Sequence, residues 1–127
     1  MHGEKILFEL SDAIIGCALT VHKELGPGLL ETTYETCLAH ELSLNNLKFE
    51  RQKSLPVKYR GTVIDCGYRI DLLVENQAIL ELKSVEKLLP IHEAQLLTYL
   101  KLSGARMGLL INFNVKLLKH GIRRMVL

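Results

Sequence analysis

Three charged residues stand inside a segment whose apolar pattern predicts a β-hairpin. The run RIDLLVENQAILELK, residues 69–83, reads as two strands rich in Ile, Leu and Val that are joined by a polar turn. Asp71, Glu81 and Lys83 lie within these strands, although such residues are rarely buried unless they are paired or bind a metal. Two neighbouring carboxylates repel each other, and each resists ionisation unless a cation lies between them. The pattern therefore indicates either a cation site or a buried ion pair.

The loop of this hairpin decides whether the three charges meet. Side chains alternate along a strand, so Glu81 and Lys83 share one face. A two-residue loop at 76–77 would send Asp71 to the opposite face. A three-residue loop at 76–78 would place Asp71 opposite Lys83 and bring all three charges together, and Asn tolerates the left-handed conformation that such a loop needs. The sequence permits both loops.

Converging carboxylates and a lysine suit metal-dependent hydrolysis of a phosphodiester. Mg²⁺ prefers oxygen ligands, uses few protein carboxylates and keeps several waters. Such an ion lowers the pKa of a bound water and stabilises the charge that builds on a phosphate, while a nearby lysine can hold that water. An isolated Glu-x-Lys would favour a plain ion pair, because short motifs occur by chance. The preceding apolar strand and Asp71 at a matching place favour the metal site.

The elements that would hold these residues follow from periodicity and turn residues. Apolar positions at steps of three and four predict helices over residues 4–25 and 29–44, separated by Gly26-Pro27-Gly28. A third helix begins at Pro90 and reaches about Ser103, where Gly104 stops it. Pro56 is expected at a strand edge or a bulge. The predicted strands cover residues 48–59, 63–74, 78–85, 107–112 and a short final 121–127.

Length and composition predict one globular domain over residues 1–127. Hydrophobic residues make up 48% of the chain and charged residues 24%, and the net charge of +2 does not by itself imply a polyanionic partner. The three cysteines are far apart and odd in number, which is typical of a reducing compartment. The longest apolar run, 13–21, is too short to span a membrane and follows acidic residues. We therefore expect a cytoplasmic protein without a membrane partner.

Basic residues gather in two segments of the sequence. Acids dominate residues 1–45, the balance reverses over 48–60, and the C-terminal tail is basic again. This asymmetry is compatible with a face that contacts phosphates, and equally with strand edges that Lys and Arg protect from pairing. The candidate nucleic-acid contacts are Lys48, Arg51, Lys53, Lys58, Arg60, Arg123 and Arg124.

Two motifs resemble a known group of nucleases. Asp71, followed after a turn by Glu81-Leu82-Lys83, resembles the D-(x)n-(D/E)-x-K signature of the PD-(D/E)XK nuclease superfamily. Gly28-Leu-Leu-Glu31-Thr-Thr-Tyr34 resembles the pattern that names the GxxExxY proteins, a branch of that superfamily. The resemblance covers about residues 10–124. One departure is Ile70, which stands where the superfamily has a proline before the aspartate.

The resemblance implies a fold, an activity and a metal site. The implied fold is a restriction-endonuclease-like α/β (α+β) fold with an αβββαβ core, in which helices flank a mixed central sheet. The implied activity is that of a Mg²⁺- or Mn²⁺-dependent nuclease that hydrolyses phosphodiester bonds through metal-activated water, with DNA as the expected substrate. The metal would be held by Asp71, Glu81, the main-chain carbonyl of Leu82 and, as a further candidate, Glu31 of the first core helix, while Lys83 would position the water.

Further candidate residues lie on the predicted helices. Gln95 and Tyr99 resemble the Q-x-x-x-Y element of nucleases associated with recombination helicases. They share one helix face at i and i+4, from which they could hold a phosphate or orient the lysine. Tyr34 is more often a core residue than a catalytic one. His22 precedes the Gly-Pro-Gly turn and is assigned a supporting role.

Two other functions remain open at this point. The chain could be a nucleic-acid-binding module that does not cleave and uses the basic segments as phosphate contacts. It could also be a regulatory interaction protein in which the charged cluster is a buried ion-pair network. For the nuclease, we expect a homodimer or a protein partner to complete the binding groove, because so small a domain has little surface for sequence readout.

Overall fold

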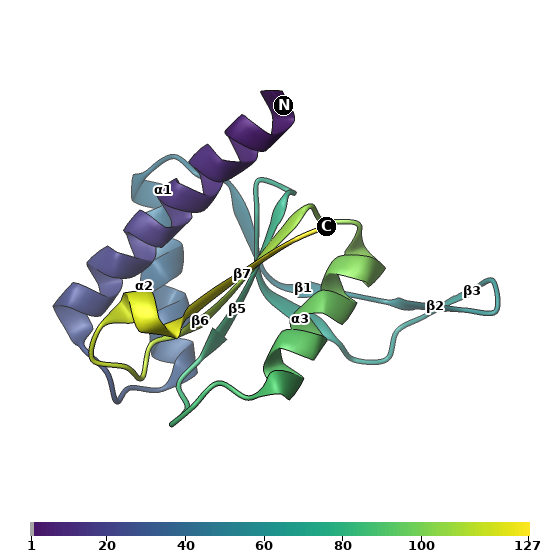
Figure 1. Ribbon diagram of the computed structural model, residues 1–127. Coiled ribbons are helices and arrows are strands. Elements are labelled where there is room, and N and C mark those ends of the chain that lie inside the picture. The colour runs from purple at the N-terminus through teal and green to yellow at the C-terminus, as the bar shows by residue number, and fades with distance from the viewer. Residues whose placement is uncertain (1) are drawn as a thin grey trace.

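A five-stranded mixed sheet lies at the centre of the molecule, with α1 and α2 on one face and α3 on the other (Figure 1). The computed structural model describes residues 2–127, with side chains from residue 6 onward. The strand order is β1-β4-β5-β6-β7, in which β5 and β6 run parallel and the other neighbours run antiparallel. The mixed α/β fold with flanking helices is therefore confirmed.

The elements follow the predicted order with two additions. The strands β2 and β3 form a separate hairpin that projects beyond the sheet (Figure 1). A short 3₁₀ helix, η1, precedes the last strand. The bounds are α1 His2–Leu25, α2 Glu31–Leu44, β1 Phe49–Ser54, β2 Val57–Tyr59, β3 Thr62–Ile64, β4 Arg69–Val74, β5 Ala78–Lys83, α3 Pro90–Ser103, β6 Met107–Asn112, η1 Leu118–Gly121 and β7 Ile122–Val126.

Each face of the sheet has its own apolar core. Leu72, Leu80 and Leu109 point toward α1 and α2, whose side chains complete the larger core. Ile79 and Leu110 point the other way and pack under α3. All six residues of β6 are buried because this strand lies between two others and under helices on both faces. No helix in the part of the chain that the structure describes is long and apolar enough to cross a membrane.

Two long strands predicted from the sequence are in fact interrupted. The segment 48–59 divides into β1 and β2 around Pro56, which has no N–H to donate to a sheet. The segment 63–74 divides into β3 and β4 around a turn in which the Asp65 carboxylate accepts a hydrogen bond from Gly67 N–H at 2.9 Å. The two interruptions lie opposite each other and release the β2–β3 hairpin from the sheet.

The loop of the central hairpin has the length of the three-residue alternative but begins one residue earlier, and the two-residue alternative is wrong. Val74 pairs with Ala78, so the loop has three residues, but they are 75–77. Glu75 and Asn76 both adopt left-handed backbone, with φ of 52° and 55°, and Gln77 N–H closes the turn by donating to Val74 O at 3.0 Å. This register places Asp71 opposite Glu81, whereas the predicted three-residue loop would have placed it opposite Lys83. The difference is two residues along β5, so Asp71 still shares a face of the sheet with Glu81 and Lys83.

Candidate active site

The hydrogen-bonded ladder between β4 and β5 gives way to two bonds that involve carboxylates. The last pair of the ladder is Leu72 with Leu80. Beyond it, Asp71 N–H donates to Glu81 Oε2 at 3.0 Å, and Leu82 N–H donates to Asp71 Oδ2 at 2.9 Å. Each carboxylate is thus fixed by the main chain of the neighbouring strand. The two acids face each other at the point where the strands separate.

This carboxylate pair lies in an environment that disfavours its negative charge. Glu81 is 6% exposed, and its burial together with the adjacent Asp71 raises the pKa of Glu81 to about 8. Burial also raises the pKa of Asp71, although the hydrogen bond from Leu82 N–H opposes the shift. Among the described residues, neither carboxylate forms an ion pair within 4.0 Å. A buried carboxylate next to a half-buried one, with no cation in contact, is the arrangement expected at a divalent-metal site.

Lys83 ends β5 beside the pair. Its charge lowers the pKa of both Asp71 and Glu81, although burial outweighs this effect at each group. The main chain of Lys83 is fixed because its carbonyl accepts a hydrogen bond from Phe113 N–H at 3.0 Å. The structure therefore brings together the three charged residues that the sequence singled out.

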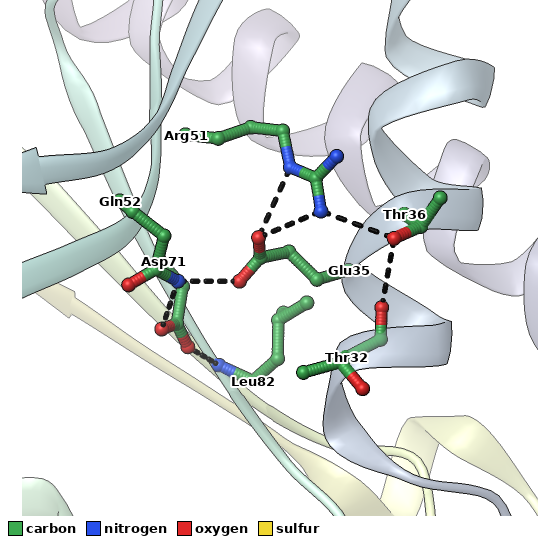
Figure 2. A network of polar contacts seen from close by, with 7 residues as sticks. All are labelled: Thr32, Glu35, Thr36, Arg51, Gln52, Asp71 and Leu82. Carbon is green, nitrogen blue, oxygen red and sulfur yellow. Dashed lines mark hydrogen bonds and ion pairs between the residues drawn. The ribbon is translucent and has the colours of Figure 1, made fainter.

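A third acid reaches the site from α2, and it is Glu35 rather than the predicted Glu31. Glu35 is 7% exposed. Its Oε1 accepts a bond from Gln52 Nε2 at 2.7 Å, and the same nitrogen donates to Asp71 Oδ1 at 3.2 Å (Figure 2). Its Oε2 pairs with the Arg51 guanidinium at 3.0 Å. Glu31 is exposed at the first position of α2, so its catalytic role stays a prediction.

Gln52 has an unusual backbone conformation for a strand residue. Its φ is 50°, in a region that non-glycine residues adopt at a cost of about 1 kcal/mol or more. Arg51 pairs with Leu72 and Lys53 pairs with Ile70, but Gln52 and Asp71, which lie opposite each other between these pairs, do not form a strand pair. At this level β4 changes face, since Leu72 belongs to the core under α1 and α2 and Ile70 to the core under α3. The distortion lets the Gln52 side chain bridge Glu35 and Asp71.

The predicted pair on α3 also borders the site. Gln95 Nε2 donates to Tyr99 Oη at 3.1 Å, and Tyr99 is 5% exposed. Burial, followed by the negative charge of Glu81, raises the pKa of Tyr99. The phenol is therefore close enough to the carboxylates to be influenced by their charge, and the catalytic role of Gln95 and Tyr99 stays a prediction.

Tyr34 stabilises the turn between α1 and α2, and His22 connects the end of α1 to the segment after β6. The Tyr34 hydroxyl donates to Gly26 O at 2.6 Å and accepts from Leu29 N–H at 3.2 Å. Its ring stacks on Phe113 with centroids 4.4 Å apart. His22 Nε2 lies 2.8 Å from a main-chain oxygen of the segment that follows β6. These contacts favour a structural role for both residues.

The candidate phosphate contacts do not form one face. Those of β1 and β7 lie at opposite edges of the sheet, and Lys58 and Arg60 lie on or beside the projecting hairpin. Several already have partners: Lys53 pairs with Glu50 at 3.0 Å, and the Arg123 guanidinium lies 3.6 Å from a carboxylate of α3. Arg124 lies over an aromatic ring of α1 at 4.9 Å from its centroid. The Arg51 guanidinium is bound to Glu35 and Thr36 of α2.

The donor set fits a hard cation better than zinc. Among the described residues, no group of three or more His, Cys, Asp and Glu side chains could hold a metal ion. Zinc sites need at least three such ligands, commonly His or Cys. Mg²⁺ and Mn²⁺ accept oxygen donors, and Mg²⁺ commonly takes one or two carboxylates and completes its shell with water and substrate oxygens. The pair Asp71 and Glu81 suits that second class of ion.

Comparison with known proteins agrees with this geometry. A model of the PD-(D/E)XK nuclease superfamily matches residues 8–125. Neither the curated proteins nor the solved structures give a significant match. The matched span includes all of the sheet except the last residue of β7, and both helices that border the carboxylates.

Proposed function

This chain belongs to the PD-(D/E)XK nuclease superfamily, and from that premise we propose that it is a metal-dependent nuclease that hydrolyses phosphodiester bonds, with DNA as the expected substrate. We further propose that it belongs to the GxxExxY branch, on the pattern from Gly28 to Tyr34. The observation that carries the activity is the pair of buried Glu81 and half-buried Asp71, which lies beside Lys83 and has no cation of the described residues within ion-pair distance.

Two carboxylates and one main-chain carbonyl would hold the metal. Asp71, Glu81 and the carbonyl of Leu82 are the proposed ligands of Mg²⁺ or Mn²⁺. When bound, such an ion supplies a more acidic water and stabilises negative charge on the phosphate. Gln52 keeps Asp71 oriented through its bond at 3.2 Å, because a ligand whose second oxygen is already engaged has fewer rotamers open to it.

Lys83 and the pair on α3 would act on the water and the phosphate. The Lys83 ammonium has three donors on a flexible stem, so it can orient the attacking water against the phosphate. Gln95 and Tyr99 offer an amide and a phenol beside the carboxylates. These groups can donate hydrogen bonds to a non-bridging phosphate oxygen or orient Lys83.

The test of this proposal is cleavage by a Lys83→Ala variant. The substrates are single- and double-stranded DNA and RNA, each incubated with Mg²⁺, Mn²⁺ or EDTA. We expect the variant to lose cleavage by about 100-fold or more, while its circular dichroism stays that of the wild type, because Lys83 is only half-buried. Lys87→Ala, at an exposed position in the loop after β5, is the matched control.

Two results would contradict the proposal in different ways. Cleavage that persists in Lys83→Ala would exclude the assigned role of the lysine. Binding of nucleic acid that survives EDTA, with no cleavage under either ion, would instead support the module that binds without cleaving.

A further inference from the structure

A cavity of about 410 Å³ opens beside the candidate active site, between α3 and the segment that leads into β4. Its volume lies within the range of about 300–1,000 Å³ that small-molecule sites occupy. The cavity shares Gln95 and Tyr99 with the site already described. Its lining residues are Val57, Tyr68, Gln95, Thr98, Tyr99 and Leu102.

An exposed aromatic ring forms one wall of this cavity. Tyr68 is 44% exposed, whereas Tyr99 is 5% exposed, so the Tyr68 ring still presents surface to an incoming group. The two ring centroids are 6.0 Å apart and the planes are tilted by 59°. The face of the Tyr68 ring is therefore not covered by a parallel Tyr99 ring, and a planar group of a ligand can stack on it.

The backbone of Tyr68 is fixed although its ring is exposed. Its carbonyl accepts hydrogen bonds from Leu55 N–H at 3.0 Å and from Arg69 Nη1 at 2.9 Å. The turn before it is closed by the Asp65 carboxylate, which also pairs with Arg69 at 3.5 Å. A wall that is ordered before binding reduces the entropy lost when a ligand is bound.

The lining chemistry selects a neutral planar ligand. None of the six lining residues is charged, so the cavity is a poor place for a phosphate, which would instead lie at the metal site and Lys83. Aromatic and aliphatic groups suit the face of a flat ring. Gln95 uses one amide hydrogen on Tyr99 and has a further donor and an acceptor with which to contact the edge of that ring.

We propose that this cavity receives one unpaired nucleobase of the substrate strand, stacked on Tyr68, while a neighbouring phosphate lies at Asp71, Glu81 and Lys83. This inference rests on the proposed nuclease function. A base held in a continuous duplex cannot leave its stack without a cost of a few kcal/mol. The protein would therefore prefer single strands, overhangs and frayed ends to a blunt duplex.

The test measures binding rather than cleavage, with Lys83→Ala as the parent protein so that the probes stay intact. The probes are a fluorescein-labelled single-stranded 12-mer and a blunt hairpin duplex, followed by fluorescence anisotropy. Tyr68→Ala should weaken single-strand binding about tenfold or more, which is the effect expected of one lost base–aromatic stack, and should leave duplex binding unchanged. Tyr68→Trp should restore the affinity.

Two further variants separate loss of the cavity from loss of the fold or of general affinity. Thr98→Trp, at an exposed position of α3 that lines the cavity, should fill it and reproduce the defect with Tyr68 intact. Tyr59→Ala removes a tyrosine that is 61% exposed on the projecting hairpin and should leave the preference for single strands intact.

An abasic scan of the 12-mer identifies the stacked base. One abasic position should weaken binding to the parent and leave binding to Tyr68→Ala unchanged. The inference is overturned if Tyr68→Ala binds the single strand as tightly as the parent, or if single strand and duplex lose affinity equally. Failure of the nuclease proposal looks different. A wild type that binds nucleic acid but does not cleave it overturns the nuclease and still allows the stacking on Tyr68 to be measured, whereas a wild type that neither binds nor cleaves overturns this inference as well.

Discussion

The raised pKa of Glu81 predicts that one neutral substitution stabilises the metal-free protein. Glu81→Gln removes the ionisable proton but keeps a side-chain oxygen. That oxygen can accept the hydrogen bond from Asp71 N–H, which is 3.0 Å long in the wild type. The amide is nearly the same size as the carboxyl group, so the buried site should not need to repack. The variant thus isolates the electrostatic cost of the wild-type acid.

The size of the effect follows from the two pKa values. The folded protein keeps a proton on Glu81 up to about pH 8, whereas the unfolded chain releases it above the ordinary value of 4.5. The unfolded state therefore binds fewer protons between these values, and the free energy of unfolding falls as the pH rises through this interval. At about 1.4 kcal/mol per pH unit, the wild type loses about 3 kcal/mol by pH 7 and almost nothing at pH 4.5.

Urea unfolding at pH 4.5, 5.5, 7 and 8 in EDTA measures this effect. We expect Glu81→Gln to exceed the wild type by about 3 kcal/mol at pH 7 and to match it closely at pH 4.5. Glu86→Gln, at an exposed position in the loop after β5, should follow the wild type at every pH. The reasoning is refuted if the wild type and Glu81→Gln show the same dependence on pH.

Three further predictions test other contacts of the structure. Asp71→Ala should lose the Mg²⁺ and Mn²⁺ binding that calorimetry detects in the wild type, and equal binding by both proteins would remove Asp71 from the metal site. Tyr34→Phe should lower the free energy of unfolding by about 1–2 kcal/mol, because the turn between α1 and α2 loses two hydrogen bonds to the hydroxyl; an unchanged value would contradict a structural role. Gly121→Ala should destabilise the fold by more than about 2 kcal/mol, because its Cβ would collide with a main-chain carbonyl at the end of β6. Gly16→Ala in α1, whose Cβ would meet no atom within 4 Å, should stabilise the helix by about 0.5–1 kcal/mol, so equal unfolding midpoints for these two alanine variants would contradict the predicted collision.

The elements that the sequence predicted well are those in which a local signal acts alone. The helix from Pro90 to Ser103 has the predicted bounds, because Pro90 favours the first turn and Gly104 adopts the left-handed conformation that ends a helix, with φ of 75°. The convergence of Asp71 with Glu81 was one of two outcomes that the sequence allowed, since it required a three-residue loop rather than a two-residue loop.

The register of the same hairpin could not be read from the sequence. Sequence rules assign left-handed turn positions to Gly and Asn first, but here Glu75 adopts that conformation as well. Its carboxylate accepts a hydrogen bond from Lys48 N–H, a contact between segments far apart in the chain. A tertiary contact of this kind accompanies a conformation that local propensity would not select.

The role of Glu35 was missed for a related reason. One signal was present, because Glu35 lies one helical turn after Glu31 and next to the buried Tyr34, so that it shares a face with the predicted acid. Its link to the site, however, depends on the left-handed Gln52 in β1. No sequence pattern predicts a glutamine in that conformation. The connection of Glu35 to Asp71 through Gln52 (Figure 2) could therefore not be predicted from the sequence.

The distribution of charge in that network argues for where a cation would bind. Glu35 already has the Arg51 guanidinium at 3.0 Å, so its charge is balanced without a metal. Among the residues that the structure describes, Lys83 is the cation whose charge lowers the pKa of both Asp71 and Glu81, and it forms no ion pair with either. The proton that Glu81 keeps up to about pH 8 supplies the balance that is missing. A divalent ion can replace that proton, so metal binding near neutral pH should release about one proton, and this release belongs to Asp71 and Glu81 rather than to Glu35.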